Sequence, residues 1–262
     1  MMRALFTGAT GMIAQQVNVD AIAHNMANVN TTGFKKSRVN FQDLLYETIQ
    51  PAGTETAAGA TIPEGIQVGH GARVSSLAKV FTQGNLIQTG NSLDWVVEGD
   101  GFFQVTLPDG TIAYTRDGSF KLDQDGQIVT ADGNPVEPAI SLPTDYVQVS
   151  ISADGSVSVL GSDGTTSSVG TVELVRFTNP AGLDARLGRN LLLETDASGT
   201  PQTGNPGEDG LGTIEQGFLE NSNVQVVEEI INLIIAQRAY EASSKVIQAS
   251  DEMLQVANNV RR

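Results

Sequence analysis

The chain has 262 residues, of which 40% are hydrophobic, and its 30 acidic and 15 basic side chains give a formal net charge of −15. This length allows one large domain or two smaller ones, and the hydrophobic content excludes a disordered chain. The acidic balance makes nucleic acid a poor partner, because a phosphate backbone is bound by clusters of Lys and Arg. The lack of cysteine excludes disulfides and thiolate chemistry.

Residues 3 to 29 are predicted to form a helix with a heptad pattern of apolar side chains. Spacings of four and three residues place these side chains in one line, which is interrupted only by the polar Gln16. The line comprises Leu5, Ala9, Met12, Val19, Ala23 and Met26. Turn-forming residues from Asn28 to Gly33 are expected to end the helix.

The segment after this helix is predicted to contain a short second helix at residues 39 to 46 and then an extended arm or long loop. The basic residues Lys35, Lys36 and Arg38 are interpreted as a solvated cluster at the helix end, where cations complement the helix dipole. From residue 51 to residue 71 the sequence PAGTETAAGATIPEGIQVGHG is rich in Gly, Ala, Thr and Pro and has no helical stripe.

Residues 80 to 211 are predicted to form short antiparallel strands joined by tight turns. Apolar residues alternate at Val147, Val149 and Ile151, and again at Val157 and Val159. Asp-Gly pairs, which favour hairpin turns, begin at Asp100, Asp109, Asp117, Asp125, Asp132, Asp154, Asp163 and Asp209.

Residues 223 to 260 are predicted to form a long terminal helix with two adjacent apolar stripes. The first has the same heptad spacing as the N-terminal helix and comprises Ile235, Ala239, Ala242, Val246, Ala249, Met253, Val256 and Val260. The second comprises Leu233, Tyr240, Ile247 and Leu254. This face is wider than a two-stranded coiled coil requires, so several helices are expected to surround it. Periodicity leaves open whether the terminal helices pair inside one monomer or contact other subunits.

Neither a cleavable signal peptide nor a membrane span is expected. Polar and glycine residues from Thr7 to Gly11 interrupt the apolar core that a signal peptide needs. The most apolar run, IINLIIA at residues 230 to 236, is much shorter than the roughly 20 residues that cross a bilayer.

No catalytic, cofactor-binding or metal-binding residues are predicted, and no cofactor. The only imidazoles, His24 and His70, are too few for a histidine-based triad or a multi-histidine metal site. Asp123 and Asp125 lack the remaining ligands of a calcium loop, and the glycine-rich pieces lack a nucleotide-binding fingerprint.

The predicted fold class is α+β, with long N- and C-terminal helices in a coiled-coil-like layer and a central antiparallel β-rich domain. Four segments are expected: an N-terminal helical segment at 1–45, an extended arm at 46–80, a β-rich outer domain at 81–212 and the C-terminal helix at 213–262.

Three motifs in order resemble the bacterial flagellar rod and hook family. They are AHNMANVNTTGFKKSRVNFQDLL near the start, VVEGDGFFQV with YTRDGSFKLDQDGQIVTADGNPV in the middle, and GFLENSNVQVVEEIINLIIAQRAYEASSKVIQASDEMLQ at the end. The resemblance covers essentially the whole chain. The length and the segment DLLYETIQPAG are most similar to those of subunits in the distal part of the rod. His24 and Ser243 depart from the family, which commonly has asparagine there.

The resemblance implies a structural, non-enzymatic subunit that polymerises into a rigid rod across the periplasm and transmits motor torque to the hook. The implied partners are further copies of the chain, the proximal rod and hook-side axial proteins, the basal-body ring proteins and the flagellar type III export apparatus. Neither nucleic acid nor membrane insertion is implied. The seams on the two terminal helices would then be contacts between subunits.

Two alternatives stay open at this point. A proximal rod or hook subunit has the same terminal motifs, but a hook subunit is expected to carry a larger inserted domain and no comparable arm. A β-class enzyme would require a cleft with clustered acidic residues, which one sequence does not reveal.

Overall fold

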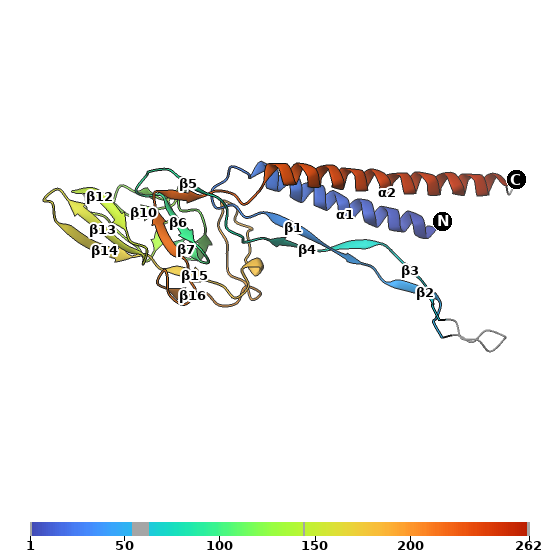
Figure 1. Cartoon of the computed structure of the whole chain (residues 1–262), viewed down its shortest axis with the longest axis horizontal. Coiled ribbons are helices and arrows are strands. Elements are labelled where there is room, and N and C mark those ends of the chain that lie inside the picture. The colour runs from blue at the N-terminus through green and yellow to red at the C-terminus, as the bar shows by residue number, and fades with distance from the viewer. Residues whose placement is uncertain (1, 54–62, 144, 261–262) are drawn as a thin grey trace. The chain divides into compact units, whose positions relative to one another are not determined.

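The computed structural model describes residues 2–53, 63–143 and 145–260 (Figure 1). By its internal contacts the chain forms two compact units. We call the first, Met1–Met26, Ser37–Ala78 and Gln225–Arg262, the helix–ribbon unit, and the second, Ala27–Lys36 and Lys79–Val224, the β unit. The α+β fold class with terminal helices and a central antiparallel β-rich region is confirmed. The division into four segments stays a prediction.

The helix–ribbon unit contains both long helices, α1 (Met2–Ala27) and α2 (Val226–Val260), at the places where the heptad patterns predict helices. A Cβ added at Gly8 would lie 2.9 Å from Ile247, and one added at Gly11 would lie 3.1 Å from Ser243. Because the contact position on α2 falls as that on α1 rises, the two helices run antiparallel, as Figure 1 shows. Glycine on α1 permits this close approach.

A β-ribbon accompanies α1. Strand β1 (Ser37–Asp43) pairs with β4 (Ala72–Lys79), and β2 (Tyr46–Gln50) pairs antiparallel with β3 (Ile66–Gly69). The side-chain amide of Asn25 donates to the carbonyl of Ser37 and accepts from its N–H, both at 2.9 Å. Arg3 forms an ion pair with Glu47. The ribbon is therefore fastened to α1 near both ends of the helix.

The prediction of a short helix at residues 39 to 46 is wrong, since β1 extends to Asp43, β2 begins at Tyr46 and the two residues between them are not helical. The backbone of this segment pairs instead with β4, and Val39 is buried while Arg38 is exposed. Alternating burial of this kind is typical of a strand. The predicted arm includes β2 and β3 of the ribbon, and its residues 54–62 lie outside the described residues.

The β unit is built from small antiparallel sheets. The largest contains β11 (Val136–Glu137), β7 (Phe102–Thr106), β8 (Ile112–Thr115), β15 (Leu174–Arg176) and β16 (Gln202–Gly204). A three-stranded sheet contains β12 (Tyr146–Ile151), β13 (Ser156–Gly161) and β14 (Thr166–Thr171). Three two-stranded sheets pair β5 (Leu86–Gln88) with β18 (Phe218–Glu220), β6 (Trp95–Glu98) with β17 (Thr213–Gln216), and β9 (Lys121–Leu122) with β10 (Ile128–Val129). A 3-10 helix covers Pro180–Gly182.

The core of the β unit centres on aromatic rings. Phe120 lies edge-on to both Trp95 and Phe103, with ring centroids 5.3 and 5.1 Å apart. All three side chains are buried. Such edge-to-face pairs stabilise a core beyond the burial of their area. A second cluster contains Phe102, Tyr114 and Phe177.

The alternating residues lie in strands, as predicted, and most of them are buried. The four side chains Val149, Ile151, Val157 and Val159 lie in the core, whereas Val147 is exposed. The pairing register of β12 with β13 shifts between Tyr146 and Gln148, which removes Val147 from the alternation.

Asp-Gly turns join several of these strands, also as predicted. The carboxylates of Asp109, Asp154 and Asp163 accept hydrogen bonds from the backbone N–H two residues on, at 3.0, 3.2 and 3.0 Å. The glycine after each aspartate has φ between +77° and +83°, which is the conformation that these turns require.

Candidate assembly surface and charged junction

The face of α2 that packs on α1 is a heptad stripe. Its buried and half-buried members recur at spacings of three, four and seven residues and are Leu233, Ala236, Ser243, Ile247, Ser250 and Leu254. Most of the second predicted stripe belongs to this face, while Tyr240 lies at its edge and lines a groove of about 420 Å³ with Val19 of α1. The intramolecular helix pair is thus present.

The first predicted seam of α2 is displaced from this face by one residue and is mostly exposed. Ile235 and Val256 are 60% and 61% exposed. Among the other members, Ala242, Val246, Ala249 and Met253 are exposed and Ala239 is half-buried. Val260 is the last residue of α2, and its side chain lies outside the description. On α1 the predicted seam is half-buried at Leu5, Ala9, Met12, Val19 and Met26, and exposed at Ala23.

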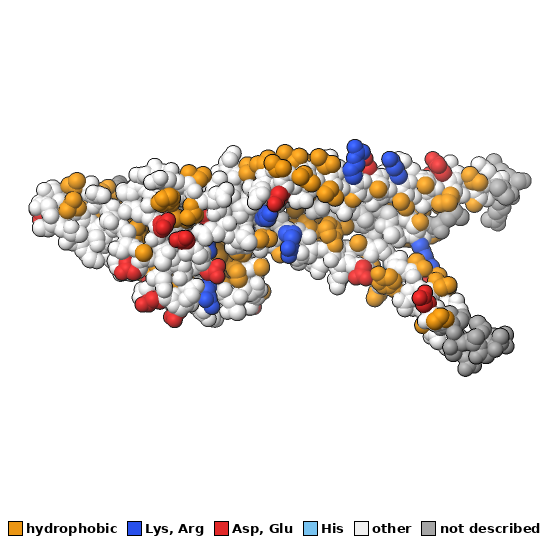
Figure 2. Space-filling model, viewed as in Figure 1, with side chains coloured by type: hydrophobic (Ala, Val, Ile, Leu, Met, Phe, Trp, Pro, Cys, Tyr) orange, Lys and Arg blue, Asp and Glu red, His pale blue; other side chains and the backbone are white. Residues whose placement is uncertain are grey.

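The first turns of α2 carry further exposed apolar residues that the heptad pattern missed. Figure 2 shows hydrophobic side chains gathered over this part of the helix. The exposed members are Val226, Val227, Ile230, Ile231 and Ile234, and on α1 they are Met2, Phe6 and Ile13. The signal in the sequence was the segment IINLII at residues 230 to 235, whose apolar side chains lie on more than one side of a helix. Exposed apolar side chains gathered in this way make this part of α2 a candidate interaction site.

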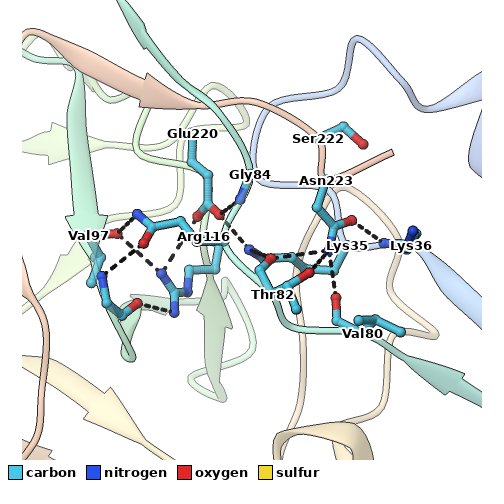
Figure 3. A network of polar contacts seen from close by, with 12 residues as sticks. Lys35, Lys36, Val80, Thr82, Gly84, Val97, Arg116, Glu220, Ser222 and Asn223 are labelled. Atoms are coloured by element: carbon cyan, nitrogen blue, oxygen red, sulfur yellow. Dashed lines mark hydrogen bonds and ion pairs between the residues drawn. The ribbon is translucent and has the colours of Figure 1, made fainter. Parts of the chain in front are cut away.

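A buried charged junction lies in the β unit, shown in Figure 3. Lys35 Nζ donates to Glu220 Oε1 at 2.5 Å and to the carbonyl of Thr82 at 2.8 Å. Glu220 Oε1 also accepts from the N–H of Gly84 at 2.8 Å, and Arg116 Nη1 lies 3.6 Å from Glu220 Oε2. The exposed fractions of the Lys35 and Glu220 side chains are 4% and 1%.

The interpretation of Lys35 as part of a solvated cluster is therefore wrong. Burial lowers the pKa of Lys35, while the charge and hydrogen bond of Glu220 oppose that effect. Burial also lowers the pKa of Arg116, again against the attraction of Glu220. Distant residues supply the compensation that makes a buried lysine possible, and no local pattern reveals them.

Asn223 joins the same chain segments through its amide. Its Nδ2 donates to the carbonyls of Val80 and Thr82 at 2.8 and 3.1 Å, and its Oδ1 accepts from the N–H of Lys36 at 2.8 Å. Together with the Lys35–Glu220 pair, it connects the segment that follows α1, the segment that follows β4 and the segment that precedes α2 (Figure 3). This arrangement is structural: it holds three chain segments in one place.

Over the described residues, no group of three or more His, Cys, Asp or Glu side chains is placed to hold a metal ion. His24 is exposed, and His70 lies half-buried between β3 and β4. Within the same ranges, no helix has the length and apolarity needed to cross a membrane.

Sequence models of three protein families match the chain. The flagella basal body rod protein model matches residues 5–35, the flagellar hook protein FlgE/F/G D1 domain model matches residues 96–159, and the flagellar basal body rod FlgEFG protein C-terminal model matches residues 215–260. The first match covers most of α1 and extends to Lys35, the second lies in the β unit, and the third covers the end of β17, β18 and α2.

Curated relatives are similar over the whole chain. The flagellar basal-body rod protein FlgG of Borreliella burgdorferi is 50% identical over 265 residues, with 100% of both chains covered. The proteins of the same name from Caulobacter vibrioides and Bacillus subtilis are 46% and 43% identical over 262 and 269 residues, covering 99% and 100% of this chain and 100% of each relative. The similarity includes both long helices, the ribbon and the β unit, and the chain therefore belongs to the family of flagellar basal-body rod proteins.

Proposed function

We propose that this protein is a structural subunit of the distal flagellar rod, which polymerises through its terminal helices into a rigid shaft that transmits torque to the hook. The observation that carries the proposal is the exposed apolar seam of α2. The helix packs one stripe on α1 and leaves the neighbouring stripe, with Ile235 and Val256, uncovered. A second copy that covers this stripe would stabilise the contact by roughly 1.5–3 kcal/mol for each Val, Ile or Met side chain that becomes fully buried.

The seam residues of both helices are the proposed subunit contacts. On α1 these are Leu5, Ala9, Met12, Val19, Ala23 and Met26, together with the exposed Phe6 and Ile13. On α2 they are Ile235, Ala239, Ala242, Val246, Ala249, Met253, Val256 and Val260. The small alanine side chains favour the close approach of a neighbouring helix. Each helix would face its intramolecular partner with one stripe and a neighbouring subunit with the other.

The β-ribbon is the proposed stiffening element of the rod. It carries exposed apolar side chains, including Leu45 between β1 and β2, Ile49 of β2 and Ile66 of β3, and their exposure to water does not stabilise a free ribbon. Contact with neighbouring subunits would cover these side chains and tie one subunit to the next. A shaft that must resist bending needs such cross-connections.

The proposed location is the rod of the basal body, across the periplasm, after export by the flagellar type III apparatus without a cleaved signal peptide. The proposed neighbours are the proximal rod, the hook-side axial proteins and the ring proteins around the rod. The membership of the family supports the location, and the exposed helix faces support contacts with further axial subunits.

Hydrogen exchange measured on the dilute monomer and on the concentrated, assembled protein tests the proposal. Peptides from α1 and α2 should exchange at least about tenfold more slowly after assembly, because new contacts suppress local opening of the helices. Peptides from β13 and β14 serve as the internal control and should change little. Equal exchange of the helices in both samples would contradict polymerisation through the terminal helices.

A further inference from the structure

A pocket of about 410 Å³ in the β unit combines aromatic walls with two guanidinium groups. Its lining includes Phe81, Phe102 and Phe177, the guanidinium groups of Arg116 and Arg176, and one carboxylate, that of Asp100. Phe102 lies edge-on to the other two rings, at centroid distances of 5.5 and 5.9 Å. Arg116 lies 5.3 Å from the Phe102 centroid, in cation–π contact. Such a lining suits a group that is both apolar and negatively charged.

The surroundings of this pocket have a surplus of positive charge. A second, smaller pocket of about 30 Å³ shares Phe81 and Arg116 with the first and is also lined by Lys35 and Lys79. Four of the 15 basic side chains of this acidic protein thus line the two pockets. Lys79 lies 5.4 Å from the Phe34 ring centroid, and across the described ranges no carboxylate pairs with it.

The carboxylates near these cations are fewer than the cations. Glu220 pairs with Lys35 and faces Arg116, and Asp100 attracts both Lys35 and Arg116. Burial lowers the pKa of Lys79, with no anion to oppose it. The four cations therefore outnumber these two carboxylates, one of which, Asp100, lines the larger pocket, within a chain whose overall charge is strongly negative.

Arg116 also keeps one donor without a partner. Its Nη1 and Nη2 donate to the carbonyls of Val97 and Gly99 at 3.3 and 2.7 Å. Its Nε is buried and has no hydrogen-bond partner. The whole side chain is only 4% exposed. A buried donor without a partner is costly, and the side chain that carries it lines both pockets.

We propose that this aromatic and cationic pocket binds a carboxylate side chain, from Asp or Glu, of a second copy of this chain. The inference rests on the proposed polymer, because the polymer holds copies side by side at high local concentration. Each copy carries 30 acidic residues and so supplies the complementary charge. The site adds to the helix seams a polar contact that selects the orientation of neighbouring β units.

Photo-cross-linking of the full-length protein tests this site. A diazirine analogue of leucine replaces Thr178, an exposed residue of the pocket lining, and in a separate sample it replaces the exposed Ile235 of α2. Mixing copies with natural and heavy nitrogen identifies adducts between copies by mass spectrometry. The Thr178 probe should join two copies, at a peptide of the second copy that contains Asp or Glu.

Charge variants provide the matched comparison. Arg176→Gln combined with Lys79→Met should lower the yield of Thr178 adducts at least about tenfold, while Lys121→Gln, at an exposed residue of β9, should leave it unchanged. The fluorescence of the only tryptophan, Trp95, which is buried in the core, checks that the variants fold.

The two probes separate the possible failures. Adducts between copies at Ile235 but not at Thr178 would overturn the pocket and leave the polymer standing. Adducts at Thr178 that join peptides without Asp or Glu, or that survive the charge variants, would overturn the carboxylate assignment. Adducts between copies at neither position would overturn both.

Discussion

Lys35 donates a 2.5 Å hydrogen bond to Glu220, a residue 185 positions away in the chain. Arg116 Nη1 lies 3.6 Å from the other oxygen of the same carboxylate, and all three side chains are buried. One carboxylate therefore lies next to two buried cations. Because each cation depends on it, the carboxylate of Glu220 is the critical group of the junction.

Glu220→Gln should destabilise the β unit by about 3–5 kcal/mol, because two buried cations lose their counterion. Urea unfolding followed through the fluorescence of Trp95, which is buried in the same unit, measures this loss. Glu215→Gln makes the same change at an exposed residue of β17 and should cost less than about 0.5 kcal/mol. Similar losses in the two variants would show that Glu220 does not have this role.

Lys79→Met should leave the monomer as stable as before at pH 7, or more stable, because it removes a half-buried charge while it keeps an apolar chain beside Phe34. Burial holds the pKa of Lys79 in the folded protein below its ordinary value of 10.5. Between these two pKa values the unfolded chain binds more protons, so this lysine makes stability rise with pH.

The variant should therefore have a flatter dependence of unfolding free energy on pH in the interval just below 10.5. Urea unfolding at several alkaline pH values measures that slope. Lys121→Gln, at an exposed residue, is the control and should keep the slope of the unchanged protein. A slope that Lys79→Met does not alter would mean that the ammonium group is solvated.

Ala242→Glu should abolish assembly and motility and leave the monomer folded. Ala242 is exposed in α2, so a carboxylate there is solvated in the free chain but would be desolvated in a covered seam. Sedimentation and swimming assays measure the effect. Gln248→Glu adds the same charge roughly 120° around the helix and is the matched control. Normal swimming of the Ala242→Glu cells would remove this seam from the proposed contacts.

Gly71→Ala should loosen the ribbon from α1. A Cβ at Gly71 would lie 2.1 Å from Thr10 Oγ1, and the residue has φ +116°. Gly53 has φ +81° with no atom within 4 Å of its Cβ position, so Gly53→Ala carries the backbone cost alone. Hydrogen exchange of β1 and β4 should increase more in the Gly71 variant. Equal increases would mean that contact with Thr10 does not matter.

Local sequence patterns predicted the helices, strands and turns of this fold better than they predicted which elements pair with one another. The heptad spacing of residues such as Met12 and Val246 indicated both long helices, and Asp-Gly pairs such as Asp109 with Gly110 indicated the turns. Residues 39 to 46 were predicted incorrectly, because their conformation depends on pairing of β1 with β4 and of β2 with β3, which come later in the chain. The propensity of a short segment is a weak constraint when a sheet partner is available.

The assembly surface and the charged junction were likewise predicted only in part. The sequence by itself determined that α2 has two apolar stripes, because side-chain spacing along a helix follows from helix geometry alone. Only the tertiary structure decided which stripe faces α1, since the stripes differ by one residue and the close approach of Gly8 to Ile247 selects between them. Likewise, the sequence determined that Lys35 follows a helix, but its burial depends on Glu220 at the far end of the chain. Contacts between residues so distant in sequence arise only when the whole chain has folded.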